Sequence, residues 1–406
     1  MDPVKNPFSP GAGTPPPALV GRQSIIDQAK VTLARIKSGR SEKSSLLIGL
    51  RGVGKTVLLR TIYDEALQLG YQAFFIETPE NKKLSQLLVP PLREILFKLD
   101  RMEHLNETVK RAMRVFRSFI GTIKFGNDDF NMSMGIDPEK GTADSGDLQA
   151  DLTTLFIAIA EAAKARHTAV ALIIDELQYI PEEEFGALIM AIHAIGQKQL
   201  PFVLMGAGLP QLVGLAGKAK SYAERLFNYP NIGALNENEA EEALKVPVKK
   251  EGVEFHPLAI KNILKTTQGY PYFLQEWGYE TWNFAKASPI TLEDIQNATP
   301  QIIKKLDENF FRVRFDRVTP NEKNYLRAMA ELGAGPYRSG DISNLLGIKV
   351  QSGAPVRSAL IKKGMIYSQS HGDINFTVPL FAEFMKRMMP TGLQQRTQSN
   401  AKTPVT

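Results

Sequence analysis

The stretch LLIGLRGVGKTVLLR, residues 46–60, decides the fold of this chain. It begins as the short apolar run of a buried strand, passes through a glycine-rich turn and continues with the periodicity of a helix. Gly49, Gly54, Lys55 and Thr56 fill the pattern G-x-x-x-x-G-K-[ST]. In such a loop the backbone N–H groups wrap phosphates, the lysine supplies a positive charge and the threonine hydroxyl coordinates Mg²⁺. The stretch therefore predicts a site for ATP and Mg²⁺, with Gly52, Val53 and Val57 completing the nucleotide-binding set.

A second apolar run, ALIIDELQYI at 171–180, ends in two adjacent carboxylates. We expect Asp175 to hold the Mg²⁺ shell together with Thr56, and Glu176 to polarise the water that attacks the γ-phosphate. A kinase transfers the phosphate to another substrate and does not need that base, so the pair favours hydrolysis. The structural alternative is that Asp175 and Glu176 only cap the following helix.

Buried-strand patterns alternate with helical patterns through the first half of the chain. The strand patterns lie at 46–48, 71–76, 169–174 and 202–205, and the helical ones include 57–69 and 148–166. This alternation predicts an α/β fold with a parallel sheet of about five strands flanked by helices.

The long connection between the second and third strands predicts an insertion at about 100–147. It contains a basic helix at 104–120, on which Lys110, Arg114 and Arg117 share one face. The stretch 121–137 has the alternation and the Gly-Asn-Asp-Asp turn of a hairpin. The basic face is a candidate nucleic-acid surface, with an ordinary solvated helix face as the alternative.

Composition changes mark the expected domain boundaries. Residues 1–17 and 391–406 are proline-rich or aperiodic and are predicted to be flexible, although Phe8 could dock. Between these ends we expect a nucleotide-binding domain at 18–235, an α-helical subdomain at 236–315 and a C-terminal domain at 316–390.

The overall composition excludes several kinds of site. The chain has 406 residues, of which 43% are hydrophobic and 23% charged, and it contains no cysteine. Disulfides, thiolate zinc sites and cysteine nucleophiles are therefore excluded. The apolar runs are too short to span a membrane, so we predict a cytoplasmic protein without a membrane partner. The net charge of +6 is compatible with nucleic acid and equally with a solvated basic surface.

These motifs resemble the AAA+ ATPases over most of residues 19–390. The resemblance is strongest to the branch that contains origin-recognition initiators, archaeal-type ATPases, transposon target-selection ATPases and STAND signalling ATPases. LVGR at 19–22 is similar to the segment that lies against adenine, which implies base contacts from Val20 and Gly21. QGYPYF at 268–273 is similar to the GxP element of a helical lid, which implies that 236–315 is that lid and that Pro271 touches the nucleotide.

The resemblance also assigns Arg225, in SYAERLFNYP at 221–230, as an arginine finger. Such an arginine reaches the γ-phosphate held by a neighbouring subunit, so activity would require a nucleotide-dependent homo-oligomer. A surface arginine paired with Glu224 is the alternative. Two departures from the family are present. Gly206-Ala207-Gly208 stands where many relatives have Asn, Ser or Thr to position the water, and the GxP site has no arginine.

The C-terminal domain resembles a winged helix, with helices at 319–332, 339–346 and 354–363, a turn at 347–353 and a hairpin wing at 364–378. Its third helix carries Arg357, Lys362 and Lys363, the candidate contacts to double-stranded DNA. The sequence thus predicts an ATPase that switches assembly state or DNA engagement. The rival is a STAND-like signalling or defence switch whose C-terminal domain binds an unidentified protein. A metabolic kinase would have no use for the acidic pair, the lid or this domain.

Overall fold

The computed structural model of the protein describes all residues except 12, 81, 102–105, 124–136, 371 and 391–406. The chain divides into two compact units. The sheet unit consists of Arg22–Gly49 and Gly54–Ile232, and the helical unit consists of Met1–Gly21, Leu50–Val53 and Gly233–Thr406. Most of the hairpin expected at 121–137, and the tail expected at 391–406, lie outside the described residues.

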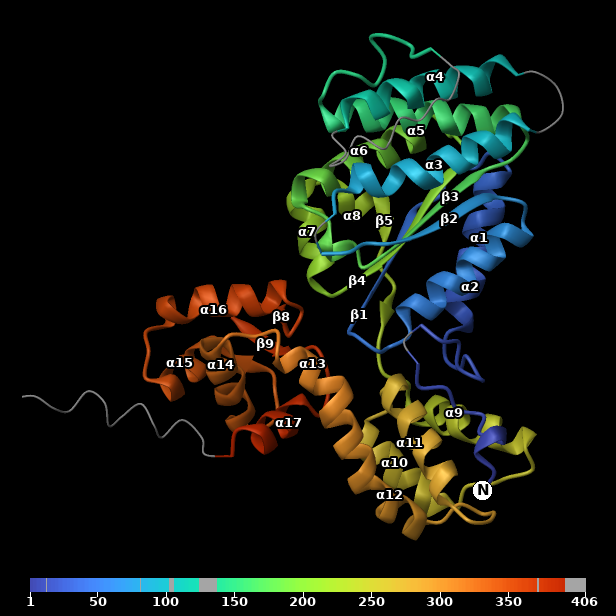
Figure 1. The fold of residues 1–406 in the computed structure, drawn as a ribbon. Coiled ribbons are helices and arrows are strands. Elements are labelled where there is room, and N and C mark those ends of the chain that lie inside the picture. The colour runs from blue at the N-terminus through green and yellow to red at the C-terminus, as the bar shows by residue number, and fades with distance from the viewer. Residues whose placement is uncertain (12, 81, 102–105, 124–136, 371, 391–406) are drawn as a thin grey trace, which may run out of the picture. The chain divides into compact units, whose positions relative to one another are not determined.

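A parallel sheet runs through the sheet unit. Its strands are β1 (Ser44–Gly49), β2 (Gln72–Glu77), β3 (Val170–Asp175), β4 (Phe202–Gly208), β5 (Phe227–Asn228) and β6 (Asn231–Ile232). The order is β2-β3-β4-β1-β5, with β6 also paired to β1, and these pairs are parallel. The predicted parallel α/β class is therefore confirmed (Figure 1).

One strand is longer than its sequence pattern indicates. The strand expected at 202–205 continues to Gly208, because its last residues keep pairing with β1 until Gly208 lies opposite Ile48. Glycine is a weak strand former by itself, so local propensity ends the predicted strand too early. The glycine-rich segment is thus part of the sheet rather than a loop after it.

Helices cover both faces of this sheet (Figure 1). They are α1 (Gln23–Lys37), α2 (Lys55–Gln68), α3 (Leu84–Asp100), α4 (Glu107–Thr122), α5 (Leu148–Ala165), α6 (Glu182–Gln197), α7 (Gln211–Ala219) and α8 (Ala223–Leu226). α1 and α2 pack together on one face, α3, α5 and α6 lie on the other, and α4 packs on α5. Parallel strands buried on both faces read as continuous apolar runs, which is why their positions are visible in the sequence.

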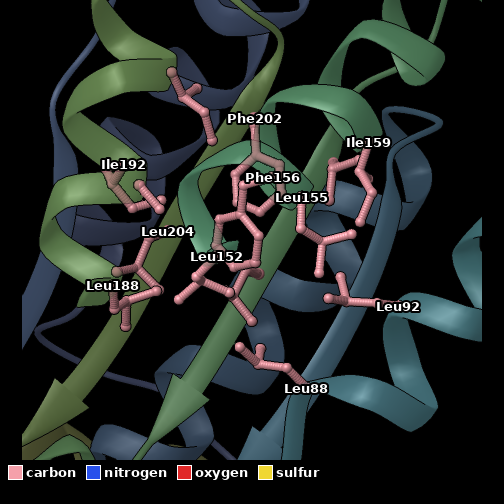
Figure 2. Packing of buried hydrophobic residues seen from close by; sticks show 14 of the residues in the cluster. Leu88, Leu92, Leu152, Leu155, Phe156, Ile159, Leu188, Ile192, Phe202 and Leu204 are labelled. Carbon is pink, nitrogen blue, oxygen red and sulfur yellow. The ribbon is translucent and has the colours of Figure 1, made fainter. Parts of the chain in front are cut away.

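The core of the sheet unit lies between the strands and α5, as Figure 2 shows. The ring of Phe156 on α5 stacks on Phe202 at the start of β4, with 4.9 Å between ring centroids. Leu152 and Leu155 fill the space beside them, and both are fully buried. Burial of one such side chain contributes about 1.5–3 kcal/mol, so this packing holds the strands, and the loops that follow them, in place.

The basic helix of the insertion, α4, is largely neutralised by acidic neighbours. Glu139 accepts a hydrogen bond from Arg111 Nε at 3.3 Å and lies 3.7 Å from Arg114 Nε, while Glu107 pairs with Lys110 at 3.2 Å. Exposed pairs of this kind are worth little energetically, yet they lower the local positive potential. α4 is consequently a weaker candidate for a nucleic-acid surface than its sequence indicates.

The helical unit begins with the N-terminal segment. The sequence predicts a flexible segment here, but the structure places its first residues against α11 (Pro271–Phe284). Phe8 is 2% exposed and packs on Gly278, where an added Cβ would lie 2.6 Å from the Phe8 ring. Asn6 Nδ2 donates to the backbone carbonyl of Tyr279, and Trp282 Nε1 donates to that of Asp2, each at 2.9 Å. These contacts hold the segment despite its composition.

The helical region that precedes the C-terminal domain consists of α9, α10, α11 and α12, and α12 continues into the η3 segment and α13. The bounds are α9 (Glu237–Lys250), α10 (Pro257–Thr267), α11 (Pro271–Phe284), α12 (Leu292–Lys305), η3 (Leu306–Phe311) and α13 (Arg312–Phe315). No helix among the described residues has the length and apolar character needed to cross a membrane.

The C-terminal domain contains three helices and a hairpin in the predicted order, together with a short strand, β7, and a last helix, α17, that the sequence analysis does not predict. It consists of α14 (Pro320–Glu331), β7 (Tyr337–Arg338), α15 (Ser339–Leu346), α16 (Val350–Lys362), β8 (Ile366–Ser370), β9 (Asp373–Phe376) and α17 (Phe381–Met388). The third helix begins at Val350, inside the turn expected at 347–353. Gly353 is buried within it, and an added Cβ would lie 3.2 Å from Ser343 Oγ. This close packing of α16 on α15 outweighs the low helix propensity of glycine.

The carboxylate of Glu322 holds the first turn of α14. It accepts hydrogen bonds from the Thr319 backbone N–H at 2.6 Å and from Lys363 Nζ at 2.7 Å. Burial by itself would raise the pKa of Glu322, but the hydrogen bonds and the charge of Lys363 outweigh it and lower this pKa below its ordinary value. The ionised Glu322 carboxylate therefore stabilises the folded state at pH values above its unfolded-state pKa. This stabilisation is lost as the pH falls through the lower, folded-state pKa of Glu322.

We expect Glu322→Gln to destabilise the C-terminal domain by about 1 kcal/mol at pH 7, because it removes a charged cap and an ion pair. The difference from the wild type should shrink in acid, where the native carboxylate is also protonated. Amide hydrogen exchange in α14 measures both effects. The matched control is Asp316→Asn, which removes an exposed carboxylate and should change little. A loss at pH 7 that persisted unchanged in acid would contradict this account.

Candidate nucleotide-binding site

The phosphate loop joins the end of β1 to the start of α2. β1 ends at Gly49, and Gly54 adopts a left-handed φ of +94° as the residue that caps α2. A side chain is strained at this φ, so glycine is needed there. Lys55, the first residue of the helix, is only 5% exposed. The N-terminal end of α2, together with this buried lysine, forms a positive pole suited to phosphate.

Thr56 and Asp175 meet at the carboxyl edge of the sheet. The Thr56 hydroxyl donates a hydrogen bond to Asp175 Oδ2 at 2.6 Å, although the two residues are 119 positions apart in sequence. β1 and β3 are parallel members of one sheet, so their carboxyl ends reach the same edge. The structure thus brings together the two residues predicted to share the metal.

The environment of Asp175 suits a divalent cation. Asp175 is 1% exposed, and this burial raises the pKa of its carboxyl group, an effect that the hydrogen bond from Thr56 partly offsets. A buried carboxylate with a raised pKa gains stability from a nearby positive charge. The hydroxyl and the carboxylate are both oxygen ligands of the kind Mg²⁺ prefers. These two residues therefore fit the predicted ion.

Glu176 follows at a sharp change of chain direction. It has a left-handed φ of +56° and leads into the short η2 helix (Leu177–Tyr179). Its carboxylate accepts a hydrogen bond from Gln178 Nε2, and Gln178 Oε1 accepts one from the Leu209 backbone N–H at 3.0 Å. Sequence reasoning missed Gln178. The sequence feature that could have identified it is a glutamine two residues after the predicted base, combined with a strand at 202–208 that ends in Gly-Ala-Gly and has no polar side chain there.

The remaining part of the phosphate loop, Leu50–Val53, belongs to the helical unit and lies against the QGYPYF segment. The Tyr272 backbone N–H donates to the Gly52 carbonyl at 3.2 Å. An added Cβ on Gly52 would lie 3.1 Å from both Tyr270 and Tyr272. Pro271 occupies the first position of α11, where a missing N–H costs nothing. The predicted GxP element is therefore adjacent to the loop, although its contact to a nucleotide stays a prediction.

Two further groups beside Leu50–Val53 favour a polar, anionic ligand. The Tyr270 hydroxyl is buried without a hydrogen-bond partner among the described residues, and its burial raises the pKa of this phenol. Arg51, Arg314, Arg317 and Lys363 line a cavity of about 130 Å³. Burial, together with the charge of Arg51, lowers the pKa of Arg314 to about 10. Negative charge nearby would stabilise such a gathering of cations.

Val20 and Gly21, the predicted base contacts, precede α1. Gly21 has a left-handed φ of +70°, and an added Cβ would lie 2.6 Å from the Glu239 carboxyl carbon on α9. Only glycine fits this approach, so the segment is fixed against α9. The role of Val20 and Gly21 in base binding stays a prediction.

Arg225 lies at the other edge of the sheet from the acidic pair. Phe227, two residues after it, pairs with Ser44 at the start of β1, whereas the phosphate loop follows the end of β1. Five residue steps along a parallel strand span about 16 Å. Arg225 is exposed and lines a cavity of about 400 Å³ with Arg40 and Lys43. The structure therefore does not bring Arg225 to the Glu176 of its own chain. No ion pair with Glu224 is present in the described part of the chain.

The three candidate DNA contacts on the third helix of the C-terminal domain differ in availability. Lys363 is occupied by Glu322 and by the Arg317 carbonyl, and Arg357 donates to Ser339 Oγ at 2.8 Å. Lys362 is exposed. Of the three predicted DNA contacts, Lys362 is thus the one whose side chain is exposed and has no hydrogen bond or ion pair with the described residues.

Comparison with protein families gives two matches. Residues 18–204 match the family described as AAA ATPase domain. Residues 308–385 match a family described as a domain of unknown function, DUF8462. No significant match to a curated protein was found.

Solved structures with the same arrangement include a Walker-type ATPase of Pyrococcus abyssi. It is 16% identical, with a TM-score of 0.55 over 91% of this chain and 96% of that chain. At this identity the likeness shows the fold alone. The ORC1 protein of Aeropyrum pernix in complex with DNA has 14% identity and a TM-score of 0.47, over 91% of this chain and 93% of that chain. The RuvB Holliday junction branch migration motor of Thermotoga maritima has 16% identity and a TM-score of 0.42, over 87% and 92%.

We expect Thr56→Val to remove the Mg²⁺-dependent gain in nucleotide affinity, by on the order of 10-fold or more, because it deletes a ligand hydroxyl while keeping the side-chain shape. Thr56→Ser, the matched control, should retain the gain. Titration of a fluorescent ATP analogue with Mg²⁺ and with EDTA measures it. An unchanged Mg²⁺ effect in Thr56→Val would remove Thr56 from the metal site.

Proposed function

Residues 18–204 belong to the AAA ATPase domain family, and on that premise we propose that the protein binds ATP with Mg²⁺ and hydrolyses it when its copies assemble. The observation that carries the proposal is the 2.6 Å hydrogen bond from Thr56 to Asp175, with Lys55 and Glu176 adjacent in sequence. It unites the phosphate loop with the acidic pair at one edge of the sheet.

Each of these residues has a distinct task in hydrolysis. Lys55 and the N–H groups at the start of α2 hold the phosphates. Bound Mg²⁺ would neutralise charge on the β- and γ-phosphates, and Thr56 and Asp175 would hold it. Glu176 accepts a hydrogen bond from the attacking water, orients it toward the γ-phosphorus and takes up its proton. Val57, Gly52 and Val53 shape the loop, and Val53 and Val57 are buried.

Arg225 makes hydrolysis dependent on a second copy. An arginine at the amino edge cannot reach the phosphates at the carboxyl edge of the same sheet, so it acts on a nucleotide held by a neighbouring copy. Such an arginine adds positive charge where negative charge develops and accelerates phosphoryl transfer by 10³–10⁵ in related systems, roughly. The proposed homo-oligomer is thus part of the active site.

The consequence of hydrolysis is a change in assembly state, with DNA engagement by the C-terminal domain as a further step. The exposed Lys362 on α16 supports DNA contact, whereas the internal bonds of Arg357 and Lys363 weaken that support. A signalling switch whose C-terminal domain binds a protein is the alternative, and the same bonds make it compatible with this surface.

We expect Glu176→Gln to bind ATP normally and to hydrolyse it at least about 10²-fold more slowly, because the amide cannot take up the proton of the water. Lys55→Ala should instead lose nucleotide binding. Arg225→Ala should bind ATP normally but lose the stimulation of turnover by protein concentration. Retained ATP affinity in Lys55→Ala, or full turnover in Glu176→Gln, would contradict the site.

Mixing the inactive variants tests the shared interface. Arg225→Ala supplies an intact base and Glu176→Gln supplies an intact arginine, so a mixed interface contains one complete site. Turnover should therefore reappear over a range of mixing ratios. Arg225→Ala mixed with Arg225→Ala/Glu176→Gln is the control and should stay inactive. Absence of recovery in the first mixture would exclude the trans-acting role.

We expect the protein to sediment as a larger species with ATP than with ADP, and duplex DNA to bind only the ATP form if DNA is the partner. Lys362→Ala should flatten the dependence of log affinity on log salt by about 0.9, because one phosphate contact is lost. Analytical ultracentrifugation and fluorescence anisotropy measure the two effects. No duplex binding at low salt with ATP would favour the protein-binding alternative.

A further inference from the structure

The end of β4 has no polar side chain, although it lies beside β3, the strand that the predicted base Glu176 directly follows. β3 and β4 are paired, with Ile174 opposite Gly206. The residues of β4 that continue past this point are Ala207 and Gly208. A polar group facing the attacking water must therefore come from another element.

η2 supplies such a group. Gln178 Nε2 donates to Glu176 Oε2, and Gln178 Oε1 accepts the Leu209 N–H at 3.0 Å, immediately after β4. Both ends of one amide are thus used, which fixes its orientation. The flipped amide would place its oxygen against a carboxylate and its NH₂ group against an N–H, and both contacts would be repulsive.

The two glycines of β4 make room for η2. An added Cβ on Gly208 would lie 2.8 Å from Gln178 Oε1, and one on Gly206 would lie 2.2 Å from Leu177 Cδ1. Real Cβ atoms do not approach this closely. The side chains of Leu177 and Gln178 therefore occupy space that a side chain on β4 would otherwise need. The left-handed turn at Glu176 directs η2 back toward β4.

We propose that Gln178 is a positioning residue for ATP hydrolysis: it holds the Glu176 carboxylate against the end of β4 and replaces the polar side chain that β4 lacks. This inference rests on the proposed function. An ionised carboxylate has two oxygens, and the bond from Gln178 to one of them leaves the other to receive the water. Through its two hydrogen bonds, Gln178 also links Glu176 to the Leu209 backbone, so the Glu176 carboxylate keeps its orientation as long as β4 stays in place.

The first test separates positioning from a general structural role. Gln178→Ala should lower kcat by on the order of 10²-fold, the effect of a misplaced catalytic group. Its KM for ATP and its affinity for a fluorescent ADP should stay within about threefold of the wild type, because the phosphate loop is intact. In a Glu176→Gln background, Gln178→Ala should have almost no further effect, because residues acting as one unit are not additive.

The second test moves the polar group onto β4. Gly208→Asn alone should impair turnover, because its Cβ collides with Gln178 Oε1. Added to Gln178→Ala, which removes the contact with Oε1 and leaves only the end of the Leu212 side chain, 2.8 Å from the added Cβ, to move aside, Gly208→Asn should restore at least about tenfold of the lost kcat by donating to Glu176 from the strand. Gly208→Asp is the matched control. It has the same shape but presents no NH₂ donor, so it should not restore turnover in the Gln178→Ala background.

The outcomes distinguish this inference from the function on which it rests. If the wild type does not hydrolyse ATP under assembling conditions, the proposed function is wrong. If the wild type does hydrolyse ATP and Gln178→Ala keeps its kcat, exceeds it, or lowers it additively with Glu176→Gln, the positioning role is wrong. Equal rescue by Gly208→Asn and Gly208→Asp would also overturn it, since packing alone would then explain the recovery.

Discussion

The hydrogen bond between Thr56 and Asp175 is the interaction on which the rest of the site depends. It joins the first turn of α2 to the end of β3, and it exists only because β1 and β3 run in the same direction within one sheet. Helix packing on both faces keeps those strand ends level. The apolar contacts around Phe156 and Phe202 therefore serve the chemistry, since they set the separation of two oxygen atoms far from them.

The glycines of β4 show how space in one strand is used by a neighbouring element. Gly206 and Gly208 have no side chains, and this permits Leu177 and Gln178 to approach the sheet. The lack of a polar side chain at the end of β4 and the position of the Gln178 amide beside it are two parts of one arrangement. Side-chain packing at Gly206 makes a simple exchange of glycine for a polar residue impossible there. A polar group delivered from η2 avoids that conflict.

The direction of the sheet separates two parts of the proposed catalytic machinery. The phosphate loop and the acidic pair follow the carboxyl ends of strands, whereas Arg225 precedes the amino end of β5. In the proposed assembly, one copy would therefore carry half of two different sites. The opposite placement of Arg225 and the phosphate loop gives a physical reason for the proposed assembly-dependent hydrolysis. An arginine side chain is much shorter than the length of β1, which separates the two ends of the sheet.

Sequence alone determined the features that depend on local chemistry and on burial. The phosphate loop, the acidic pair, the parallel sheet and the alternation of strands and helices are visible because backbone phosphate binding needs glycines and a doubly covered strand must be apolar. Three helices and the hairpin of the C-terminal domain were predictable from helix periodicity and turn residues, whereas β7 and α17 were not.

Tertiary structure decided which side chains meet. Propensity ended β4 too early and started α16 too late, because pairing with β1 and packing on Ser343 outweigh the cost of glycine. Arg114 on α4 and Lys363 at the end of α16 look available in sequence, yet Glu139 and Glu322 come from distant positions to pair with them. The Gln178 amide likewise depends on a distant partner, since Leu209 lies 31 residues away in the sequence. Such contacts depend on the three-dimensional arrangement of strands and helices, and no local pattern records them.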